Sequence, residues 1–399
     1  MQVKTVQNVQ MPDLSPVSEV EVVESFLTEN YELRNNVLSH KMEVRDRQGD
    51  HTEKFRPLTR EAMNSIIIAA RKDLVEIKNP KPLITELIQS EGTPNYDPIK
   101  EYLESLPAWD GQERVDALFR CLPGVDDQHV DWLHTWLRSA VAHWLDLDML
   151  HGNECAPVLI GHQGVQKSAF CRRILPEHLR TYYLDHINLA NKFDKEMALT
   201  HNLLVNIDEL DQVKPKQQAE LKQTLTKFNV NGRPIYGRAQ RDDKRYASFI
   251  ATTNCRTPLQ DPTGSRRYIC IEIPDGQLID NETEIDYDQL YAQLLHELRV
   301  EKRRYWFTNE ETLQIQKANE PYQREVTIEE IVNTCFRKPN ESEQIIPIPL
   351  ADMITHMSKS FPEIKITHGL RINVARELLA QGYKHKKVHS VALYFAVCA

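Results

Sequence analysis

Apolar side chains recur at helical spacing along much of the chain, and this periodicity predicts a series of amphipathic helices. Before the middle of the chain, the predicted helices span residues 18–28, 59–72, 113–120 and 129–150. After it, they span residues 286–302, 310–317, 329–337, 350–359 and 370–379. Residues 31–44 predict a pair of strands with a turn near Ser39 and His40, and residues 388–397 are strand-like.

The pattern changes between Ala156 and Ile273, where short β-rich runs alternate with helical segments. The predicted strands there span residues 158–160, 203–207, 247–252 and 268–271. Alternation of this kind favours a mostly parallel sheet with helices on both faces, so the predicted fold class is α/β. Because the last helices end in a short strand pair, we also expect a small winged-helix-like domain at the C-terminus.

Composition is typical of a soluble globular protein, with 41% apolar and 27% charged residues. The net charge is −9 at pH 7, so any contact with nucleic acid must come from a local basic patch. The seven cysteines form no CxxC pair and no cluster at metal-ligand spacing, which favours a reduced cytosolic protein. No secretion signal is visible, and no apolar run approaches the roughly 20 residues that span a membrane. We therefore predict a cytoplasmic location.

Trp132, Trp136 and Trp144 are spaced by four and eight residues on the helix predicted for residues 129–150. Such a stripe of aromatic side chains would be able to stack nucleic-acid bases. Packing in the core is the favoured interpretation, because large aromatic side chains are mostly buried.

The sequence GHQGVQKS follows the strand at residues 158–160 and precedes a segment that is predicted to be a helix. Strand, Gly-containing loop, Lys-Ser and helix is the layout of a phosphate-binding P-loop. Backbone N–H groups of the loop, which includes Gly161, Gly164 and Gln166, would face the phosphates of ATP, and Lys167 would bring a cation to them. Ser168 would offer its hydroxyl to Mg²⁺. Because the motif normally has Gly where this chain has Gln166, efficient turnover is in question.

Two further predicted strands end in polar side chains. The strand at residues 203–207 is followed by Asp208 and Glu209, which is the form of a Walker B element. Asp208 would hold Mg²⁺, and Glu209 would act as the general base on the attacking water. The strand at residues 247–252 leads to Asn254, whose amide would orient that water. Each feature alone fits an ordinary turn, but ligands of open α/β sheets bind beyond the carboxyl ends of the strands, where all these residues are expected.

The sequence GSRRY places Arg266 and Arg267 immediately before the strand at residues 268–271. An Arg on such a loop would be able to reach the nucleotide of a neighbouring subunit as an arginine finger. We favour Arg266 for this role. Surface salt bridging is the alternative interpretation.

A basic segment at residues 229–246 holds five Lys or Arg against two Asp. Turn signals at Gly232 and Gly237 predict a hairpin. Basic side chains on a hairpin would make salt-dependent contacts with the phosphates of single-stranded DNA. A solvated charged loop is the alternative. The candidate DNA-binding residues are Arg238, Arg241, Lys244 and Arg245.

The order of GHQGVQKS, LLVNIDEL, FIATTN and GSRRY resembles the virulence-associated protein E family, in the superfamily-three branch of AAA+ helicases. The upstream sequence YDPIKEYLESLPAWDG is similar to the helical lead-in of that family, so the resemblance covers about residues 95–275. It implies ring-forming, ATP-driven DNA helicases or replication-initiation proteins of phages and mobile elements. It also implies the phosphate, metal, base, sensor and finger roles of the matching residues: Lys167, Ser168, Asp208, Glu209, Asn254 and Arg266.

With this resemblance, we predict five parts of the chain. Residues 1–80 form an α+β region of unclear role, and residues 81–150 form a helical lead-in. Residues 151–275 form a P-loop core of the AAA+ helicase type. A helical connector follows at residues 276–335, and the winged-helix-like domain covers residues 336–399.

The leading functional hypothesis is an ATP-dependent DNA helicase or replication-initiation protein of a mobile genetic element or prophage. Its expected cofactors are ATP and Mg²⁺, and its expected partners are single-stranded DNA, further copies in a hexameric ring and a separate primase. The second hypothesis is a catalytically weakened P-loop module that binds or loads DNA, and Gln166 motivates it. A third is a signalling NTPase that does not bind nucleic acid.

Overall fold

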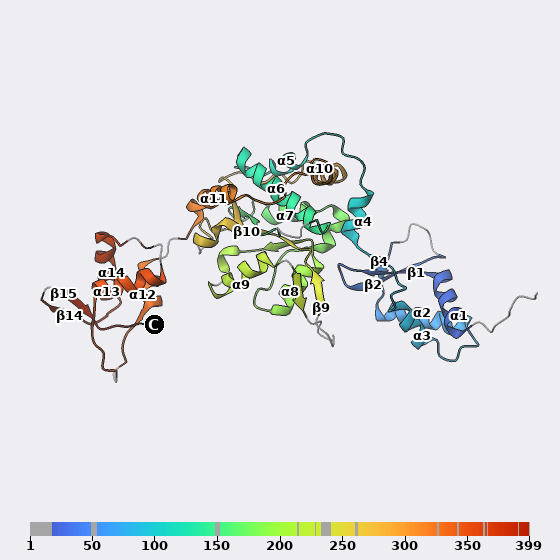
Figure 1. Ribbon diagram of the computed structural model, residues 1–399, viewed down its shortest axis with the longest axis horizontal. Helices are drawn as coiled ribbons and strands as arrows, with labels where there is room; N and C mark the ends of the chain where they lie inside the picture. Colours follow the sequence, from blue (N-terminus) through green and yellow to red (C-terminus); the bar gives the residue numbers. More distant parts are fainter. Residues whose placement is uncertain are drawn as a thin grey trace, which may run out of the picture. The chain divides into compact units, whose positions relative to one another are not determined.

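The structure is a computed structural model, and its described residues fall into two compact units. The first unit comprises Met1–Arg256 and Thr263–Asn319, and the second comprises Thr257–Pro262 and Glu320–Ala399. Figure 1 traces the elements of each unit along the chain. The residues that the structure describes are 18–48, 54–147, 152–213, 215–227, 229–232, 241–259, 262–324, 327–340, 343–361, 364, 366–389 and 391–398. Within these ranges no helix combines the length and apolar character that crossing a membrane requires.

The first unit begins with helices packed on a small sheet. Ser18 caps the first helix in a capping box with Glu21, and His40, at φ 52°, lies in the turn between the first two strands. The sheet has the strand order β3-β2-β1-β4. The predicted first helix and strand pair are confirmed. The elements are α1 (Glu19–Asn30), β1 (Tyr31–Asn36), β2 (Lys41–Asp46), β3 (Arg56–Pro57), α2 (Arg60–Asp73), α3 (Lys81–Ile88) and β4 (Asn95–Tyr96).

Three helices follow: α4 (Pro98–Ser105), α5 (Val115–Phe119) and α6 (Asp127–Trp144). The helix α6 ends at Trp144, whereas its apolar pattern predicted an end near Leu150. Trp132, Trp136 and Trp144 are at most 4% exposed, so the prediction that they pack in the core is confirmed.

A five-stranded parallel sheet forms the centre of the first unit, which confirms a mixed α/β fold. Its strands are β5 (Ala156–Ile160), β6 (Tyr183–Leu184), β7 (Leu204–Ile207), β10 (Ser248–Thr253) and β11 (Tyr268–Glu272). Their order is β11-β5-β10-β7-β6. Thr253 pairs with Ile160, and Ala251 pairs with Ile207, so the carboxyl ends of β5, β10 and β7 lie at one edge.

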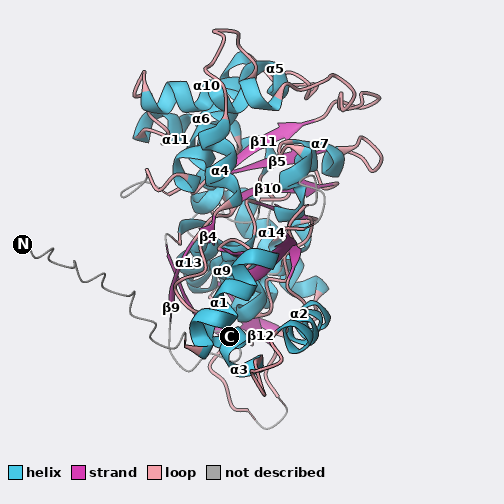
Figure 2. Cartoon of the chain, turned by 90° about the vertical axis from the view of Figure 1, so that its right-hand side faces the viewer, coloured by secondary structure: helices cyan, strands magenta, loops and turns pink. Residues whose placement is uncertain are grey.

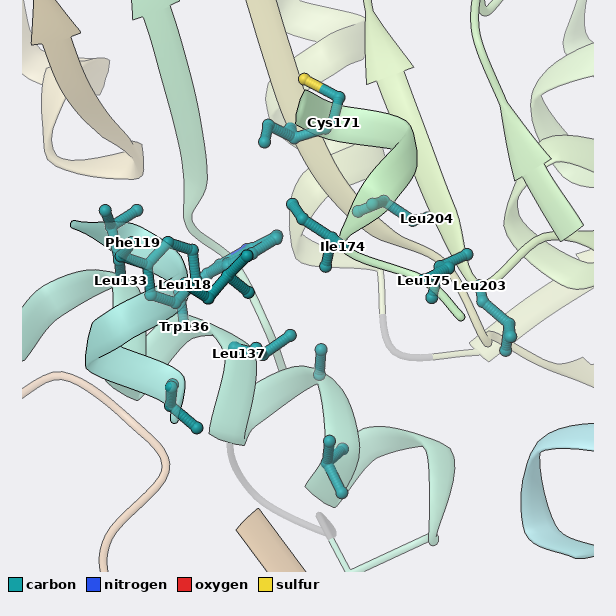
Figure 3. Packing of buried hydrophobic residues seen from close by; sticks show 14 of the residues in the cluster. Leu118, Phe119, Leu133, Trp136, Leu137, Cys171, Ile174, Leu175, Leu203 and Leu204 are labelled. Atoms are coloured by element: carbon teal, nitrogen blue, oxygen red, sulfur yellow. The ribbon is translucent and has the colours of Figure 1, made fainter. Parts of the chain in front are cut away.

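Helices and a hairpin connect these strands and complete the unit. They are α7 (Lys167–Arg173), η1 (Glu177–Tyr182), α8 (Lys192–His201), η2 (Leu210–Gln212), α9 (Pro215–Thr226), β8 (Asn229–Gly232), β9 (Arg241–Lys244), η3 (Pro262–Arg267), α10 (Tyr287–Arg299) and α11 (Asn309–Ala318). Figure 2 shows α5, α6 and α10 close together beside the sheet. In the core, Trp136 and Leu137 of α6 belong to the same buried cluster as Ile174 and Leu204 (Figure 3).

A buried polar network joins α5, α6 and α10. His134 lies 2.7 Å from an oxygen of Asp116 and 3.0 Å from Glu297, and the Arg138 Nε donates to Glu297 at 2.6 Å. Burial acts to raise the pKa of Glu297, but His134 and Arg138 outweigh it and hold this pKa at about 2. Burial acts to lower the pKa of His134, but the carboxylates of Asp116 and Glu297 raise it above its ordinary value. The network therefore favours charged forms of both groups.

In its described residues, the second unit contains three α-helices, a short 3-10 helix and two small sheets. Its core contains Val332 of α12, Met353 of α13 and Val374 of α14. One sheet has the order β13-β15-β14, and the other pairs β12 with β16. The elements are η4 (Glu320–Tyr322), α12 (Ile328–Cys335), β12 (Phe336–Arg337), β13 (Ile348–Pro349), α13 (Leu350–Ser360), α14 (His368–Ala380), β14 (His385–Val388), β15 (Val391–Tyr394) and β16 (Val397–Cys398).

The segment predicted to be strand-like, residues 388–397, spans the end of β14, all of β15 and the start of β16. The chain reverses after Val388, which pairs with Val391, and His389 has a left-handed backbone with φ 47°. A hairpin results, because a positive φ matches the reversal of a tight turn.

Candidate functional site

The loop between β5 and α7 follows a strand whose five residues are all buried. Gly161 packs closely: a Cβ there would lie 3.1 Å from the Cβ of Ile273 and 3.3 Å from Val165. Gly164 has φ +92°, a conformation that side-chain-bearing residues rarely adopt. Both positions therefore favour glycine.

Gln166 also has a left-handed backbone, with φ 68° and ψ 31°. This conformation explains why the motif normally has Gly before the Lys, because a Cβ is unfavourable there. Asn281 supports the strained residue: its Nδ2 donates to the backbone oxygen and to the Oε1 of Gln166, both at 3.2 Å. The Ile279 N–H also donates to the Val165 oxygen at 3.3 Å. The segment before α10 thus holds the loop in place.

Lys167 is the first residue of α7, and its side chain turns back over the loop. Its ammonium donates to the oxygen of Gly161 at 2.7 Å, to that of His162 at 3.0 Å and to the Oδ1 of Asn254 at 2.9 Å. The residue is 8% exposed, and burial lowers its pKa. All three acceptors are neutral oxygens, so an anion at this position would be a stronger partner.

The two carboxylates after β7 are exposed at the same edge of the sheet. Asp208 accepts a hydrogen bond of 2.5 Å from the Thr252 hydroxyl of β10. Glu209 has a left-handed backbone with φ 53° and immediately precedes the short helix η2. A small cavity of about 180 Å³ lies beside both carboxylates and is also lined by His186 and Gln212. Carboxylate oxygens in such a place suit Mg²⁺.

Asn254 follows β10 and connects the loop with this acidic region. Its amide oxygen accepts from Lys167, while the neighbouring Thr253 hydroxyl donates to Asp211 at 2.5 Å. The structure therefore brings Lys167, Asp208 and Asn254 to one edge of the sheet, as the order of their strands predicts. Ser168 is exposed at the start of α7.

This arrangement offers the groups that a bound polyphosphate needs. It combines a glycine-containing loop before a helix, a buried ammonium and exposed carboxylates on adjacent strands. Lys167 and the backbone of residues 161–166 could hold phosphate oxygens. Ser168 and Asp208 could hold Mg²⁺, leaving Glu209 free to accept a proton.

Arg266 lies at the opposite edge of the sheet. It belongs to η3, immediately before β11, and Tyr268 of β11 pairs with Ala156 at the start of β5. The Cys155 thiol donates to the Arg266 backbone oxygen at 3.7 Å, and the Arg266 side chain is exposed. Because β5 and β11 are parallel, this amino edge faces away from Lys167.

The basic hairpin is present, with Asn229 of β8 paired to Lys244 of β9, but its candidate residues differ in position. Arg238 lies outside the described residues, and so does the side chain of Arg241. Lys244 is already bonded within the protein. Its Nζ donates to the backbone oxygen of Trp144 at 2.7 Å and forms an ion pair with Asp146 at 2.9 Å.

The prediction that Arg245 contacts DNA is corrected. Arg245 is 1% exposed, and its guanidinium donates to the backbone oxygens of Ala247, Leu225, Lys227 and Asn153. Burial lowers its pKa to about 10, so the group stays charged at neutral pH. A guanidinium held by four internal carbonyls is a structural cation that no phosphate can reach.

Two features of the site carry no local sequence signal. Asn281 lies 115 residues from Gln166 in the chain, and only the fold brings them together. The Thr252 bond to Asp208 also joins different strands, although the alignment of β7 with β10 places such contacts within reach.

A second group of potential ligands joins two residues of the buried network, His134 and Glu297, with the exposed Glu113. Three potential ligand atoms lie within 4.8 Å of one another, one each from Glu113, His134 and Glu297. The Gln293 amide already donates to both carboxylates, at 2.5 Å and 3.1 Å, while Arg138 donates to Glu297. These groups are therefore satisfied by protein donors, which favours a structural role.

The fold and the site define an α/β protein whose candidate ligand groups gather at the carboxyl edge of a parallel sheet. Residues 103–324, more than half of the chain, match the virulence-associated protein E-like domain. The chain belongs to this family.

Comparison with solved structures returns the C-terminal region of NrS-1. Its "A form apo structure" has 13% sequence identity and a TM-score of 0.44, covering 94% of this chain and 98% of that one. A second apo structure, of residues 305–718, has 14% identity and a TM-score of 0.44, covering 95% and 99%. No curated protein matches the chain.

Proposed function

We propose that the chain is an ATP-dependent DNA helicase or replication-initiation protein of a mobile genetic element or prophage. The observation that carries this proposal is the contact of Lys167 with the loop oxygens and Asn254, beside the exposed Asp208. The order of the five parallel strands, with this loop after a central strand, also supports a P-loop core of the AAA+ type. Membership of the virulence-associated protein E-like family is consistent with such a core.

In this proposal the bound ATP and Mg²⁺ supply the phosphoanhydride bond and the neutralising divalent charge. Lys167 exchanges its carbonyl partners for phosphate oxygens, a change favoured because its ammonium is buried and lacks an anionic partner among its bonds. Ser168 and Asp208 hold the metal ion. Glu209 accepts a proton from the attacking water, and Asn254 orients that water.

The experiment measures ATP hydrolysis with and without single-stranded DNA. Lys167→Ala should abolish turnover while the fold, followed by circular dichroism, is retained. Gln163→Ala is a matched control, because Gln163 is an exposed residue of the same loop. Absence of both nucleotide binding and hydrolysis in the wild-type chain would overturn the proposal.

Arg266 is proposed to act in trans within a ring, which we propose is a hexamer. Its place at the amino edge of the sheet supports this, because Lys167 lies at the other edge of the same subunit. Mixing inactive Lys167→Ala and Arg266→Ala chains should restore part of the hydrolysis, since some interfaces then combine an intact loop with an intact Arg. No restoration in mixed oligomers would contradict a trans role.

The proposed contact with single-stranded DNA now rests on Arg238 and Arg241 of the hairpin. Lys244 and Arg245 are engaged inside the protein. Charge reversal of Arg238 and Arg241 should weaken binding of a single strand and reduce its dependence on salt. An unchanged affinity of this variant for single-stranded DNA would show that the hairpin does not contact the DNA.

The second candidate is a catalytically weakened module that binds or loads DNA and works with a separate primase. The left-handed backbone of Gln166 favours it, because a strained loop residue can displace the phosphate-binding amides from their best geometry. A large gain of hydrolysis in Gln166→Gly would support this candidate. An unchanged or lower rate would support the helicase.

A further inference from the structure

The second unit carries basic residues on its last helix and on the hairpin that follows. Residues 366–399 contain five Lys or Arg against a single Glu, whereas the whole chain has a net charge of −9. All five side chains are exposed. They are Arg371 and Arg376 of α14, Lys384, and Lys386 and Lys387 of β14.

The helix α14 buries one face and leaves the other open. Val374 and Leu378 are fully buried in the core of the unit. His368, Ile372, Arg376 and Leu379 follow one another at spacings of three or four, so they share a different face. This open face includes two large apolar side chains that are nearly half exposed, Ile372 at 46% and Leu379 at 48%.

The hairpin β14–β15, which follows α14 in the chain, is also basic. All four residues of β14 are exposed, and Lys387 pairs in register with Ala392 of β15. Within the part of the chain that the structure describes, none of the ion pairs uses a basic residue of α14 or β14. By contrast, Arg337 of the same unit is neutralised by Glu343 at 2.8 Å. The cations of this surface are thus available to an external anion.

We propose that α14 and the β14–β15 hairpin form a binding surface for double-stranded DNA. A helix fits the major groove, which is about 12 Å wide. Arg376 can donate to base edges there, while Ile372 and Leu379 can contact thymine methyl groups. Lys386 on the hairpin then binds the phosphate backbone. The packing of α12, α13 and α14 in one core gives the open helix a rigid support.

The surface fits a duplex better than a single strand. Proteins that bind single strands stack the bases on exposed aromatic rings. In the described residues from His368 to Cys398, Tyr383 and Tyr394 are buried, and Phe395 is partly covered. The surface therefore combines charge and aliphatic side chains without an exposed Phe, Tyr or Trp platform. It also differs from the hairpin proposed for single-stranded DNA.

The test measures binding of a 20-base-pair duplex to the full chain by fluorescence anisotropy at low salt. Arg376→Glu combined with Lys386→Glu should weaken duplex binding at least tenfold and lower the slope of log affinity against log salt by about 2. Lys72→Glu combined with Lys78→Glu is the matched control. It makes the same change of net charge at exposed lysines of the first unit and should leave affinity within twofold.

Three outcomes would overturn the inference: no duplex binding by the wild-type chain, equal loss in the test and control variants, or a loss confined to single-stranded DNA. Circular dichroism of both variants should match the wild type, because all four positions are exposed. A fluorescent ATP analogue is titrated in parallel. If the wild-type chain binds no nucleotide but its duplex binding depends on Arg376 and Lys386, the proposed function fails and this inference stands.

Discussion

Replacement of Gln166 separates backbone strain from side-chain contacts at the loop. Gln166 has φ 68°, a region that costs a residue with a Cβ about 1–2 kcal/mol and costs Gly nothing. Gln166→Ala keeps this strain, and Gln166→Gly removes it. Both variants lose the 3.2 Å bond from Asn281 to the side-chain oxygen, so the difference between them isolates the backbone term.

The magnitude follows from two opposing effects. Gly gains the relief of strain but loses about 0.5–1 kcal/mol through the greater freedom of its unfolded chain. The Gly variant should therefore be more stable than the Ala variant by about 0.5–1 kcal/mol. Relative to wild type, Ala should cost about 0.5–1.5 kcal/mol for the lost hydrogen bond, and Gly should be close to neutral.

Thermal unfolding followed by tryptophan fluorescence reports this difference. All five tryptophans lie in the first unit, which also contains the loop. The Gly variant should unfold about 1–3 °C above the Ala variant. Gln163 is the control, because it is exposed and is not among the residues with positive φ. There Gly should be no more stable than Ala. An Ala variant of Gln166 as stable as the Gly variant would refute the strain argument.

Three further predictions concern contacts outside the loop itself. Asn281→Ala removes both bonds to the loop and should lower stability by about 1–2 kcal/mol in the same fluorescence assay. Arg245→Ala leaves several buried carbonyls without a donor and should cost more than about 3 kcal/mol in urea unfolding, with Lys intermediate. In His134→Gln the free energy of unfolding should fall less between pH 5.5 and pH 9 than it does in the wild type. The pKa of His134 is raised in the folded protein. Its ionisation therefore contributes fully to the free energy of unfolding below its unfolded pKa of about 6.5, and this stabilisation is lost as the pH rises through its folded pKa. The stabilisation from Glu297 is complete above its unfolded pKa of about 4.3 and is lost as the pH falls through about 2. The difference in the free energy of unfolding between pH 5.5 and pH 9 therefore reports His134 and not Glu297.

Much of the site could be predicted from sequence because its groups follow directly after strands. Each strand is a buried apolar run, and a parallel sheet brings the carboxyl ends of its neighbours to one edge. Lys167, Asp208 and Asn254 meet there through short local connections to β5, β7 and β10. The close contacts among these three residues also require β5, β10 and β7 to be neighbours, which the observed order β11-β5-β10-β7-β6 provides.

Arg245 could not be placed in this way. It continues a run of charged residues, and charge alone predicts exposure. Its burial depends on carbonyl groups from α9 and from the segments flanking the sheet, which converge on it only in the folded chain. The end of α6 escaped prediction for a similar reason, because the apolar pattern continues beyond Trp144 where the helix stops.

The departure of Gln166 from the P-loop pattern acquires a physical meaning from these contacts. At the level of sequence, Gln166 puts efficient turnover in question because the motif normally has Gly at this position. The structure instead gives Gln166 the left-handed backbone that Gly would have, and its exposed side chain is bonded to Asn281. The unfavourable effect of Gln166 is then mainly backbone strain, which the hydrogen bonds from Asn281 partly offset. If this is correct, Gln166→Gly should change the rate of hydrolysis less than threefold while it makes Asn281→Ala less damaging to stability. A gain of more than tenfold in rate would show that Gln166 hinders the nucleotide, through its side chain or its strained backbone, and would favour the weakened module over the helicase.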